Sequence, residues 1–333
     1  MADSSARSRQ YWTAGPGHGE LRTAPVPRPE PGEALIRTRY SAVSPGTERL
    51  VHRGGVPESV QHLMRAPFQL GELPHPVSHG YLNVGDVVEG PDQLKGRLVF
   101  TLGGHREHLT VPIEDCHVLP EAMPASRALL AGPAETALNA LWEAPVLLGD
   151  RVIVVGGGLI GLSTALLASR MGLSRLTVVE PDPKRRELVA SLGMQVVSPG
   201  DTEGDADVVL HSSATAQGLA EAMRLTGDDG VLIEQSWYGE QSPEVPLGAD
   251  FHARRLRIVG SQVGAVAQPR RLRRTPRQRL VCALELLDAR FDALLAPPIA
   301  LEELPALMRQ LDRGDLPPGL LCPVIDHRPR GET

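Results

Sequence analysis

The stretch Val152-Ile-Val-Val-Gly156-Gly-Gly158-Leu-Ile-Gly161 decides the fold class of this chain. An uncharged β-branched run ends in three glycines, and an apolar run with helical spacing follows. In a G-x-G-x-x-G turn between a strand and a helix, the first glycine permits a tight turn and the second lets a pyrophosphate approach the backbone. The third lets the helix pack close to the strand. We therefore expect a dinucleotide-binding βαβ unit here.

A second apolar run, Arg175–Glu180, follows this turn and ends in an acid. An acid at the end of the second strand accepts hydrogen bonds from the adenosine ribose hydroxyls, so Glu180 favours NAD over NADP. Arg185, in a basic run just beyond, could instead reach the 2′-phosphate of NADP. The phosphates themselves are expected at the first helical N–H groups, around Leu159 and Ile160.

Strand and helix patterns alternate through the rest of this region, which implies a parallel sheet with right-handed crossovers. The predicted strands are 151–155, 175–180, 206–210, 230–235 and 256–259. The predicted helices are 159–171, 183–192 and 216–225. The sequence therefore predicts an α/β protein with a doubly wound Rossmann sheet.

The chain before this region has a different texture, rich in Pro, Gly and short β-branched runs. Strands are predicted at 34–40, 84–88, 97–102 and 107–112, and helical segments at 120–133 and 136–142. After Gly264, helices are predicted at 278–287 and 301–311, and a strand at 320–325 that rejoins the first domain. We expect a β-rich domain over 1–128, a nucleotide-binding domain over 129–264, and a returning segment over 265–333.

Composition excludes several classes of protein. The formal net charge is −6, which argues against general binding to nucleic acid or to an anionic membrane. The three cysteines, Cys116, Cys282 and Cys322, lie far apart and form no CxxC pair, so neither a disulfide framework nor a four-thiolate zinc site is expected. A reducing cytoplasm fits this cysteine usage best.

A cluster of basic residues precedes the predicted helix at 278–287. Its members are Arg270, Arg271, Arg273, Arg274, Arg277 and Arg279. No aromatic residue is interleaved and no groove-reading motif is visible, so nucleic-acid binding is not indicated. We interpret the cluster as a solvated loop leading into a helix, with an acidic substrate or partner as the alternative.

The order of these regions resembles the medium-chain dehydrogenase/reductase superfamily over nearly the whole chain. Three segments carry the resemblance: Glu135-Thr-Ala-Leu-Asn-Ala-Leu, the glycine turn, and Gly260-Ser-Gln-Val-Gly264. The resemblance implies a GroES-like β-rich domain, NAD (or NADP) as cofactor, a small-molecule substrate, and a homodimer. It also implies that Thr136 and Ser261 flank the nicotinamide.

Two N-terminal segments make the chain similar to a zinc-free branch of that superfamily, near the bacteriochlorophyllide dehydrogenases. The positions that hold zinc ligands in the alcohol dehydrogenases read Ser44, Tyr81 and Leu82, and another falls near 131–133. Catalytic zinc needs about three ligands from Cys, His and carboxylate. The alternative is a partial metal site formed by His75 and His79 with Glu48 or Glu72. No catalytic metal is predicted.

Without a metal, another group must donate a hydrogen bond or a proton to the oxygen that gains charge during hydride transfer. Thr47 matches the proton-relaying hydroxyl of the zinc relatives, or else it caps a turn beside Pro45-Gly46. Tyr81 replaces a metal ligand, or else it lies at the edge of the core.

Histidines in loops provide further candidates for acid–base work. His105 follows an apolar strand through a glycine turn, where an imidazole could serve as acid or base or could be merely solvated. His52 and His79 are alternatives in other loops. Glu48 either orients Arg49 or the nicotinamide ribose, or it is a plain surface carboxylate.

These observations lead to one main hypothesis and two others. The first is a zinc-independent NAD(P)-dependent oxidoreductase that acts on an alcohol or carbonyl substrate. The second is an enoyl or quinone reductase. The third is a protein that binds NAD(P) without turnover and serves as a redox sensor or structural subunit.

Overall fold

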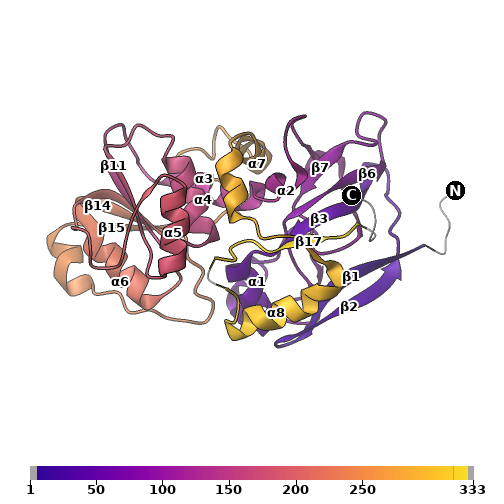
Figure 1. The fold of residues 1–333 in the computed structure, drawn as a ribbon, viewed down its shortest axis with the longest axis horizontal. Helices are drawn as coiled ribbons and strands as arrows, with labels where there is room; N and C mark the ends of the chain where they lie inside the picture. Colours follow the sequence, from indigo (N-terminus) through magenta and orange to yellow (C-terminus); the bar gives the residue numbers. More distant parts are fainter. Residues whose placement is uncertain (1–5, 318, 329–333) are drawn as a thin grey trace. The chain divides into compact units, whose positions relative to one another are not determined.

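The structure, a computed structural model, describes residues 6–317 and 319–328 and separates the chain into two units (Figure 1). Unit 1 comprises Met1–Gly132 and Leu295–Thr333, and unit 2 comprises Pro133–Leu294. The first division falls close to the boundary expected at 128. The chain returns to unit 1 only at Leu295, well beyond the return expected at 265.

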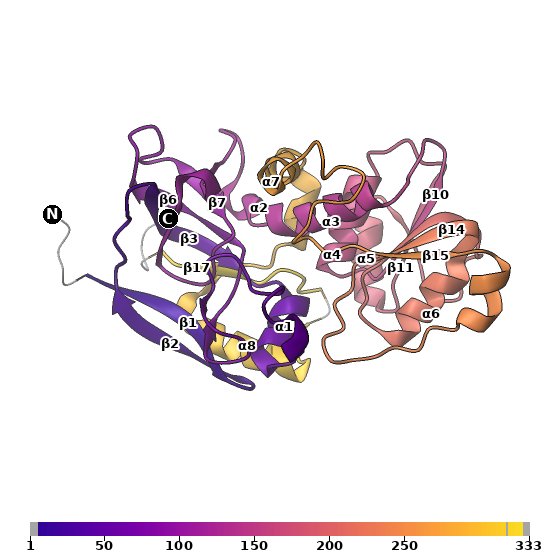
Figure 2. The ribbon, with the colours of Figure 1, turned by 180° about the vertical axis from the view of Figure 1, so that it is seen from behind.

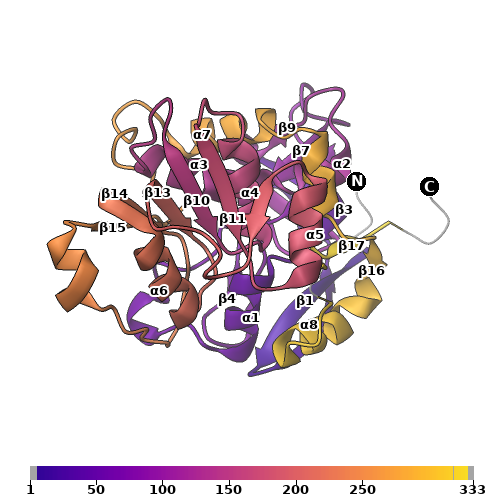
Figure 3. The same ribbon diagram turned by 60° about the vertical axis from the view of Figure 1, so that its left-hand side comes forward.

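Unit 2 contains a six-stranded parallel sheet in the order β12-β11-β10-β13-β14-β15 (Figure 3). Its strands are β10 (Arg151–Val155), β11 (Arg175–Val179), β12 (Gln195–Val197), β13 (Ala206–His211), β14 (Thr226–Glu234) and β15 (Arg257–Gly260). The order reverses between β10 and β13, which is the switch point of a doubly wound fold. The predicted Rossmann sheet is confirmed, and β12 is the strand that the sequence did not predict.

Helices connect these strands and cover the sheet. They are α3 (Ala131–Glu143), α4 (Leu159–Ala168), α5 (Pro183–Ser191), α6 (Ala216–Leu225) and α7 (Pro276–Glu285), with short turns η3 (Leu247–Phe251) and η4 (Ala289–Leu294). The connection through α4 runs toward β11 and the connection through α6 runs toward β14. Right-handed crossovers therefore place α4 and α6 on opposite faces. Helix α6 packs Leu219, Ala222 and Met223 against strand residues such as Ile153 and Val209.

Residues 276–294 belong to unit 2, and a buried ion pair connects α7 to α3. The Arg279 side chain is 2% exposed, and its Nε donates to Glu135 Oε1 at 3.0 Å. Its Nη1 donates to Asn139 Oδ1 at 2.6 Å and to the Ala265 carbonyl at 2.9 Å. The expectation that Arg279 lies in a solvated loop is therefore wrong, because its guanidinium fills a polar site under the helix. The other five arginines of the cluster are exposed.

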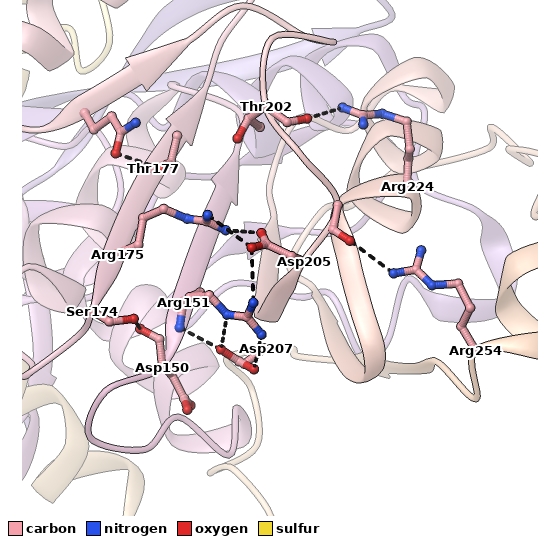
Figure 4. A network of polar contacts seen from close by, with 12 residues as sticks. Asp150, Arg151, Ser174, Arg175, Thr177, Thr202, Asp205, Asp207, Arg224 and Arg254 are labelled. Carbon is pink, nitrogen blue, oxygen red and sulfur yellow. Dashed lines mark hydrogen bonds and ion pairs between the residues drawn. The ribbon is translucent and has the colours of Figure 1, made fainter.

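Ion pairs connect the amino ends of three neighbouring strands of the parallel sheet (Figure 4). Arg151, the first residue of β10, pairs with Asp207 at 3.0 Å and with Asp205 at 3.1 Å. Arg175, the first residue of β11, also pairs with Asp205. The network lies at the sheet edge opposite the glycine turn, because the turn follows the carboxyl end of β10.

Unit 1 is built from two sheets. The smaller has the order β2-β1-β5-β4, and the larger has the order β16-β17-β3-β6-β7-β9 with β8 paired to β3. The smaller sheet contains β1 (Arg7–Gly15), β2 (His18–Pro25), β4 (Leu70–Gly71) and β5 (Val77–Ser78). The larger contains β3 (Glu33–Ala42), β6 (Asn83–Glu89), β7 (Leu98–Thr101), β8 (His108–Pro112), β9 (His117–Val118), β16 (Ile299–Ala300) and β17 (Val324–Asp326). The expected return is confirmed, because β17 pairs with β3.

Three α-helices accompany these sheets: α1 (Pro45–Arg53), α2 (Ala125–Ala128) and α8 (Leu304–Arg313). Short turns are η1 (Glu58–Val60), η2 (Ile113–Asp115) and η5 (Leu301–Glu303). Helices α1 and α8 lie side by side, near the hairpin β1–β2 (Figure 2). Apolar residues of α8 at helical spacing, Leu304, Leu307, Met308 and Leu311, pack with Tyr11, Val43 and Ile325. In the part of the chain that is described, no helix is both long and apolar enough to cross a bilayer.

We expect Arg279→Ala to lower the free energy of unfolding by about 3–5 kcal/mol, because it leaves the Glu135 carboxylate buried without its cation. Arg277→Ala, two residues away and exposed, is the matched control and should stay within about 0.5 kcal/mol of wild type. Urea unfolding of the two variants makes the comparison. Equal effects would contradict the structural role assigned to Arg279.

Candidate functional site

The glycine turn of unit 2 has the geometry that a pyrophosphate site needs. Gly156 has φ +107°, which glycine adopts without strain, and a Cβ at Gly161 would overlap the Gly156 carbonyl oxygen. Gly158 is the N-cap of α4 and has no side chain to accept from the first N–H groups of the helix. A Cβ at Gly158 would meet nothing within 4 Å. The amino end of α4 therefore presents backbone donors and a positive dipole end to open space.

Glu180 lies directly after β11 and joins this turn. Its Oε2 accepts from the Gly157 N–H at 2.6 Å, and its Oε1 accepts from the Asp182 N–H at 2.8 Å. The residue is 2% exposed. The Arg185 guanidinium lies 4.0 Å from the same carboxylate. The structure therefore brings Glu180, Arg185 and the glycine turn together, in the arrangement that suits an adenosine ribose.

The remaining predicted cofactor contacts lie on three elements of unit 2. Leu159 and Ile160 form the first turn of α4, next to Gly161. Ser261 follows the carboxyl end of β15, and its Oγ accepts from Asn139 Nδ2 at 3.4 Å. Asn139 lies on α3, one turn after Thr136. The side chain of Asn139 thus joins Ser261 to the helix that carries Thr136.

A polar cluster at the carboxyl ends of β13 and β14 was not predicted. His211 ends β13 and is fully buried, with Nδ1 at 2.8 Å from Glu234 Oε2 and Nε2 at 2.6 Å from Ser213 Oγ. Tyr238 donates its hydroxyl to the same Glu234 oxygen at 3.2 Å. One signal in the sequence could have found this cluster, since polar residues end two adjacent predicted strands at the edge where α/β proteins bind ligands.

In unit 1, the hydroxyl groups of Tyr81, Ser44 and Thr47 come together. Burial raises the pKa of the Tyr81 phenol to about 12, although hydrogen bonds with the Ser44 and Thr47 side chains oppose the shift. Thr47 lies in the first turn of α1, so the expected loop there is a helix. Pro45 at its first position is compatible with a helix because that N–H needs no partner. A phenol with this pKa stays protonated at neutral pH and can donate a proton.

A second polar group in unit 1 is a buried chain of hydrogen bonds that connects Glu48 to His327. Glu48 Oε2 lies 2.8 Å from His105 Nε2, His105 Nδ1 lies 2.8 Å from Ser41 Oγ, and that oxygen lies 2.8 Å from His327 Nε2. Glu48 also accepts from the Ser44 N–H at 2.8 Å. Burial favours neutral Glu48, but the charge and hydrogen bond of His105 lower its pKa overall.

The structure differs from two expectations, one about His105 and one about Glu48. His105 is 1% exposed rather than solvated in a loop, because the turn that carries it folds inward onto the Glu48 carboxylate. Glu48 is 3% exposed and is neither a surface carboxylate nor a partner of Arg49. His105 therefore holds Glu48 and does not itself contact solvent.

His79 and Glu48 line one small cavity of unit 1, with about 10 Å³ of space, together with Tyr11, Thr13, Val51 and Met308. The predicted alternative metal site does not assemble around them. Glu72 is exposed and pairs with Arg65 at 2.8 Å. Over residues 6–317 and 319–328, no three His, Cys, Asp or Glu side chains cluster as a metal site would require.

Comparison with known proteins is consistent with this description. A family model described as an FAD binding domain matches residues 151–236, which include the glycine turn. The chain is 25% identical to 2-dehydro-3-deoxy-L-galactonate 5-dehydrogenase of Pseudoalteromonas atlantica, over 51% of this chain and 52% of that protein. It is 26% identical to (R,R)-butanediol dehydrogenase of Bacillus subtilis, over 62% of this chain and 67% of that protein. The chain thus spans about half to two thirds of these relatives.

Two solved structures share the fold across nearly the whole chain. A protein described as a zinc-binding dehydrogenase from Sinorhizobium meliloti, bound to NADP, has a TM-score of 0.77 at 18% identity and covers 97% of this chain and 100% of its own. Acetophenone reductase of Geotrichum candidum, in complex with NAD, has a TM-score of 0.77 at 17% identity and covers 98% of each chain.

We expect unit 1 to lose stability between pH 7 and pH 5. Burial lowers the pKa of His79 to about 4, so the unfolded chain binds a proton at higher pH than the folded chain does. Stability is therefore complete above about pH 6.5, the unfolded pKa, and is lost as the pH falls toward 4. His79 alone should contribute about 2 kcal/mol of loss by pH 5.

Urea unfolding at the two pH values tests this expectation. In His79→Gln, which cannot titrate at this position, the difference in unfolding free energy between pH 7 and pH 5 should shrink by about 2 kcal/mol. In the exposed control His62→Gln, that difference should equal the wild-type value. An unchanged difference in His79→Gln would show that His79 binds its proton normally.

Proposed function

We propose that this chain, one of the medium-chain, zinc-type alcohol dehydrogenase-like proteins, is an NAD(P)-dependent oxidoreductase acting on an alcohol or its carbonyl product. We propose further that it works without the zinc after which those proteins are named. The observation that carries the proposal is the open space before Gly158 at the amino end of α4, with Glu180 beside it. These features fit a dinucleotide diphosphate and its adenosine ribose. Bound there, the nicotinamide would supply or accept the hydride.

NAD is the proposed cofactor, with NADP as the alternative. The Glu180 side chain accepts from two backbone N–H groups. A carboxylate there suits ribose hydroxyls and would repel a 2′-phosphate. Arg185, 4.0 Å from Glu180, is the residue through which NADP could still bind. The family model for FAD binding matches residues that include the strand–turn–helix, a unit that binds the diphosphate in both FAD and NAD proteins.

Tyr81 is the proposed proton donor. Its phenol is protonated at neutral pH and lies with Ser44 and Thr47, whose hydroxyls can pass a proton onward. Of the predicted acid–base residues, His105 acts only through Glu48, because its ring is buried in that ion pair. His105 is therefore a positioning residue in this proposal.

The substrate is proposed to carry a secondary hydroxyl. The name of one relative describes dehydrogenation of a sugar acid at carbon 5, and the name of another describes dehydrogenation of butanediol. Zinc independence rests on the residues at the ligand positions, since Ser44 and Tyr81 offer hydroxyls and Leu82 offers no donor. A cytoplasmic location and a homodimer stay predictions.

Two alternatives follow from the same cofactor site. An enoyl or quinone reductase would use the hydride on a conjugated substrate, and a redox sensor would bind NADH without consuming it. A panel of carbonyl, enone and quinone substrates separates them.

Binding of the cofactor is tested with Gly158→Ala. We expect NADH affinity to fall at least about 10-fold, because the new Cβ occupies the open space that the diphosphate needs, whereas the fold loses at most about 1 kcal/mol. Gly248→Ala is the matched control, since its Cβ also meets nothing within 4 Å. Calorimetric titration and a thermal melt separate binding from folding.

The same titrations test the cofactor preference. Wild type should bind NADH more tightly than NADPH, and Glu180→Ala should reduce the difference. Tighter binding of NADPH by wild type would reverse the assignment. If intact protein binds neither dinucleotide, the proposed function fails.

Turnover tests the proton donor and the metal together. We expect Tyr81→Phe to lower kcat by about 10²–10⁴-fold at unchanged NADH affinity, because the phenol acts only during the reaction. Tyr40→Phe, whose ring stacks under Arg328, is the control. Elemental analysis of the purified protein should find less than stoichiometric zinc. Stoichiometric zinc whose removal abolishes turnover would contradict zinc independence.

A further inference from the structure

The polar cluster at the carboxyl ends of β13 and β14 has no role in the proposed function so far. It contains a line of three side chains, Ser213, His211 and Glu234, with separations of 2.6 Å and 2.8 Å. Thr215 extends the line, because its Oγ1 lies 3.0 Å from Ser213 Oγ. The distances alone leave open which atom donates in each hydrogen bond, so the direction follows from the charge state of the carboxylate.

Glu234 sets the direction of the line. Burial raises its pKa, but hydrogen bonds from His211 and Ser236 lower it overall, so the carboxylate is charged and only accepts. His211 must then donate from Nδ1, which leaves Nε2 as an acceptor in the neutral ring. Ser213 therefore donates its hydroxyl proton to Nε2. The hydrogen bond between Ser213 and Thr215 follows the same direction. Thr215 Oγ1 accepts from the Gly218 N–H at 3.0 Å and can donate its own proton to Ser213 Oγ.

As a result, the hydroxyl proton of Ser213 points toward His211, and one lone pair of its oxygen remains free to accept a hydrogen bond. Ser213 is half-buried, whereas His211 is fully buried, so the serine is the accessible end of the pair. Gly218 leaves room for the hydroxyl, because a Cβ there would overlap Ser213 Oγ. Ala214 adopts φ +51° and donates its N–H to Ser236 Oγ at 3.1 Å, which fixes the turn.

The serine lies beside the glycine turn. A Cβ at Gly156 would lie 3.0 Å from the Ser213 backbone nitrogen and 3.2 Å from Ser212 Oγ. The Ser212 N–H donates to the carbonyl of Val155, the last residue of β10, at 2.9 Å. The loop after β13 thus borders the space in front of α4, at the switch point of the sheet.

We propose that Ser213 accepts a hydrogen bond from a donor group of the bound dinucleotide, either a ribose hydroxyl or the nicotinamide amide, and that His211 and Glu234 hold it in that accepting state. This inference rests on the proposed function. A phosphate oxygen is excluded at Ser213, because phosphate only accepts and the serine proton is already used. Besides Ser213, the groups facing His211 are Glu234, Tyr238, Ser236 and the backbone at Gly218.

Calorimetric titration of wild type and Ser213→Ala tests the proposal with three probes: ADP, ADP-ribose and NADH. We expect NADH to bind about 3- to 10-fold more weakly to the variant, the loss of one hydrogen bond. If the variant already binds ADP more weakly than wild type does, the adenosine ribose is the donor. If the weakening first appears with ADP-ribose, the second ribose is the donor. If only NADH binds more weakly, the nicotinamide amide is the donor. The exposed Ser191→Ala should bind all three as wild type does.

The direction of the line is tested with Glu234→Gln. The Ser236 N–H donates to Oε1 at 2.7 Å, so the new amide keeps its oxygen there and places its NH₂ toward His211 Nδ1. The imidazole must then carry its proton on Nε2 and donate to Ser213. We expect the same loss of NADH affinity as in Ser213→Ala, and no additional loss in the double variant.

Unchanged affinity for every probe in Ser213→Ala, or wild-type affinity in folded Glu234→Gln, would overturn the proposal. If wild type binds no dinucleotide, the proposed function fails instead.

Discussion

The close approach of α4 to the end of β10 is the constraint on which the rest of unit 2 depends. Gly161 packs so near the Gly156 carbonyl that no larger residue fits, and this contact directs the start of the helix at the space beyond the sheet. Glu180 then binds the Gly157 N–H and closes the turn from the neighbouring strand. The loop after β13 is held against the same turn, because the Ser212 N–H donates to the Val155 carbonyl. The proposed cofactor contacts therefore share one backbone framework.

Much of the fold could be predicted because unit 2 repeats one pattern. Buried parallel strands are continuous apolar runs, and the predicted helix at 216–225 coincides with α6. The elements that were missed lack such runs. The hairpin β1–β2 is largely polar along its length, and α1 begins with Ser-Pro-Gly, which is typical of a turn. Tertiary contacts with α8 stabilise α1 where local preference does not.

The candidate site was predicted where a short motif carries it and missed where distant residues meet. The glycine turn and Glu180 lie in one βαβ unit, so spacing alone identifies them. His105 and Glu48 are 57 residues apart, and Arg279 and Glu135 are 144 apart. Local composition placed Arg279 in a solvated loop, and it left solvent-exposed alternatives open for His105 and Glu48. Charged side chains that are buried in pairs cannot be recognised until both partners are located.

The ion-pair network at the amino ends of β10, β11 and β13 has a consequence for how this chain tolerates change (Figure 4). It joins the strands at the edge away from the proposed cofactor site, so the loops at the other edge contribute less to holding the sheet together. We therefore expect those loops to accept substitutions without first loosening the scaffold. An architecture of this kind lets recognition diverge among descendants while the frame that supports it is inherited unchanged.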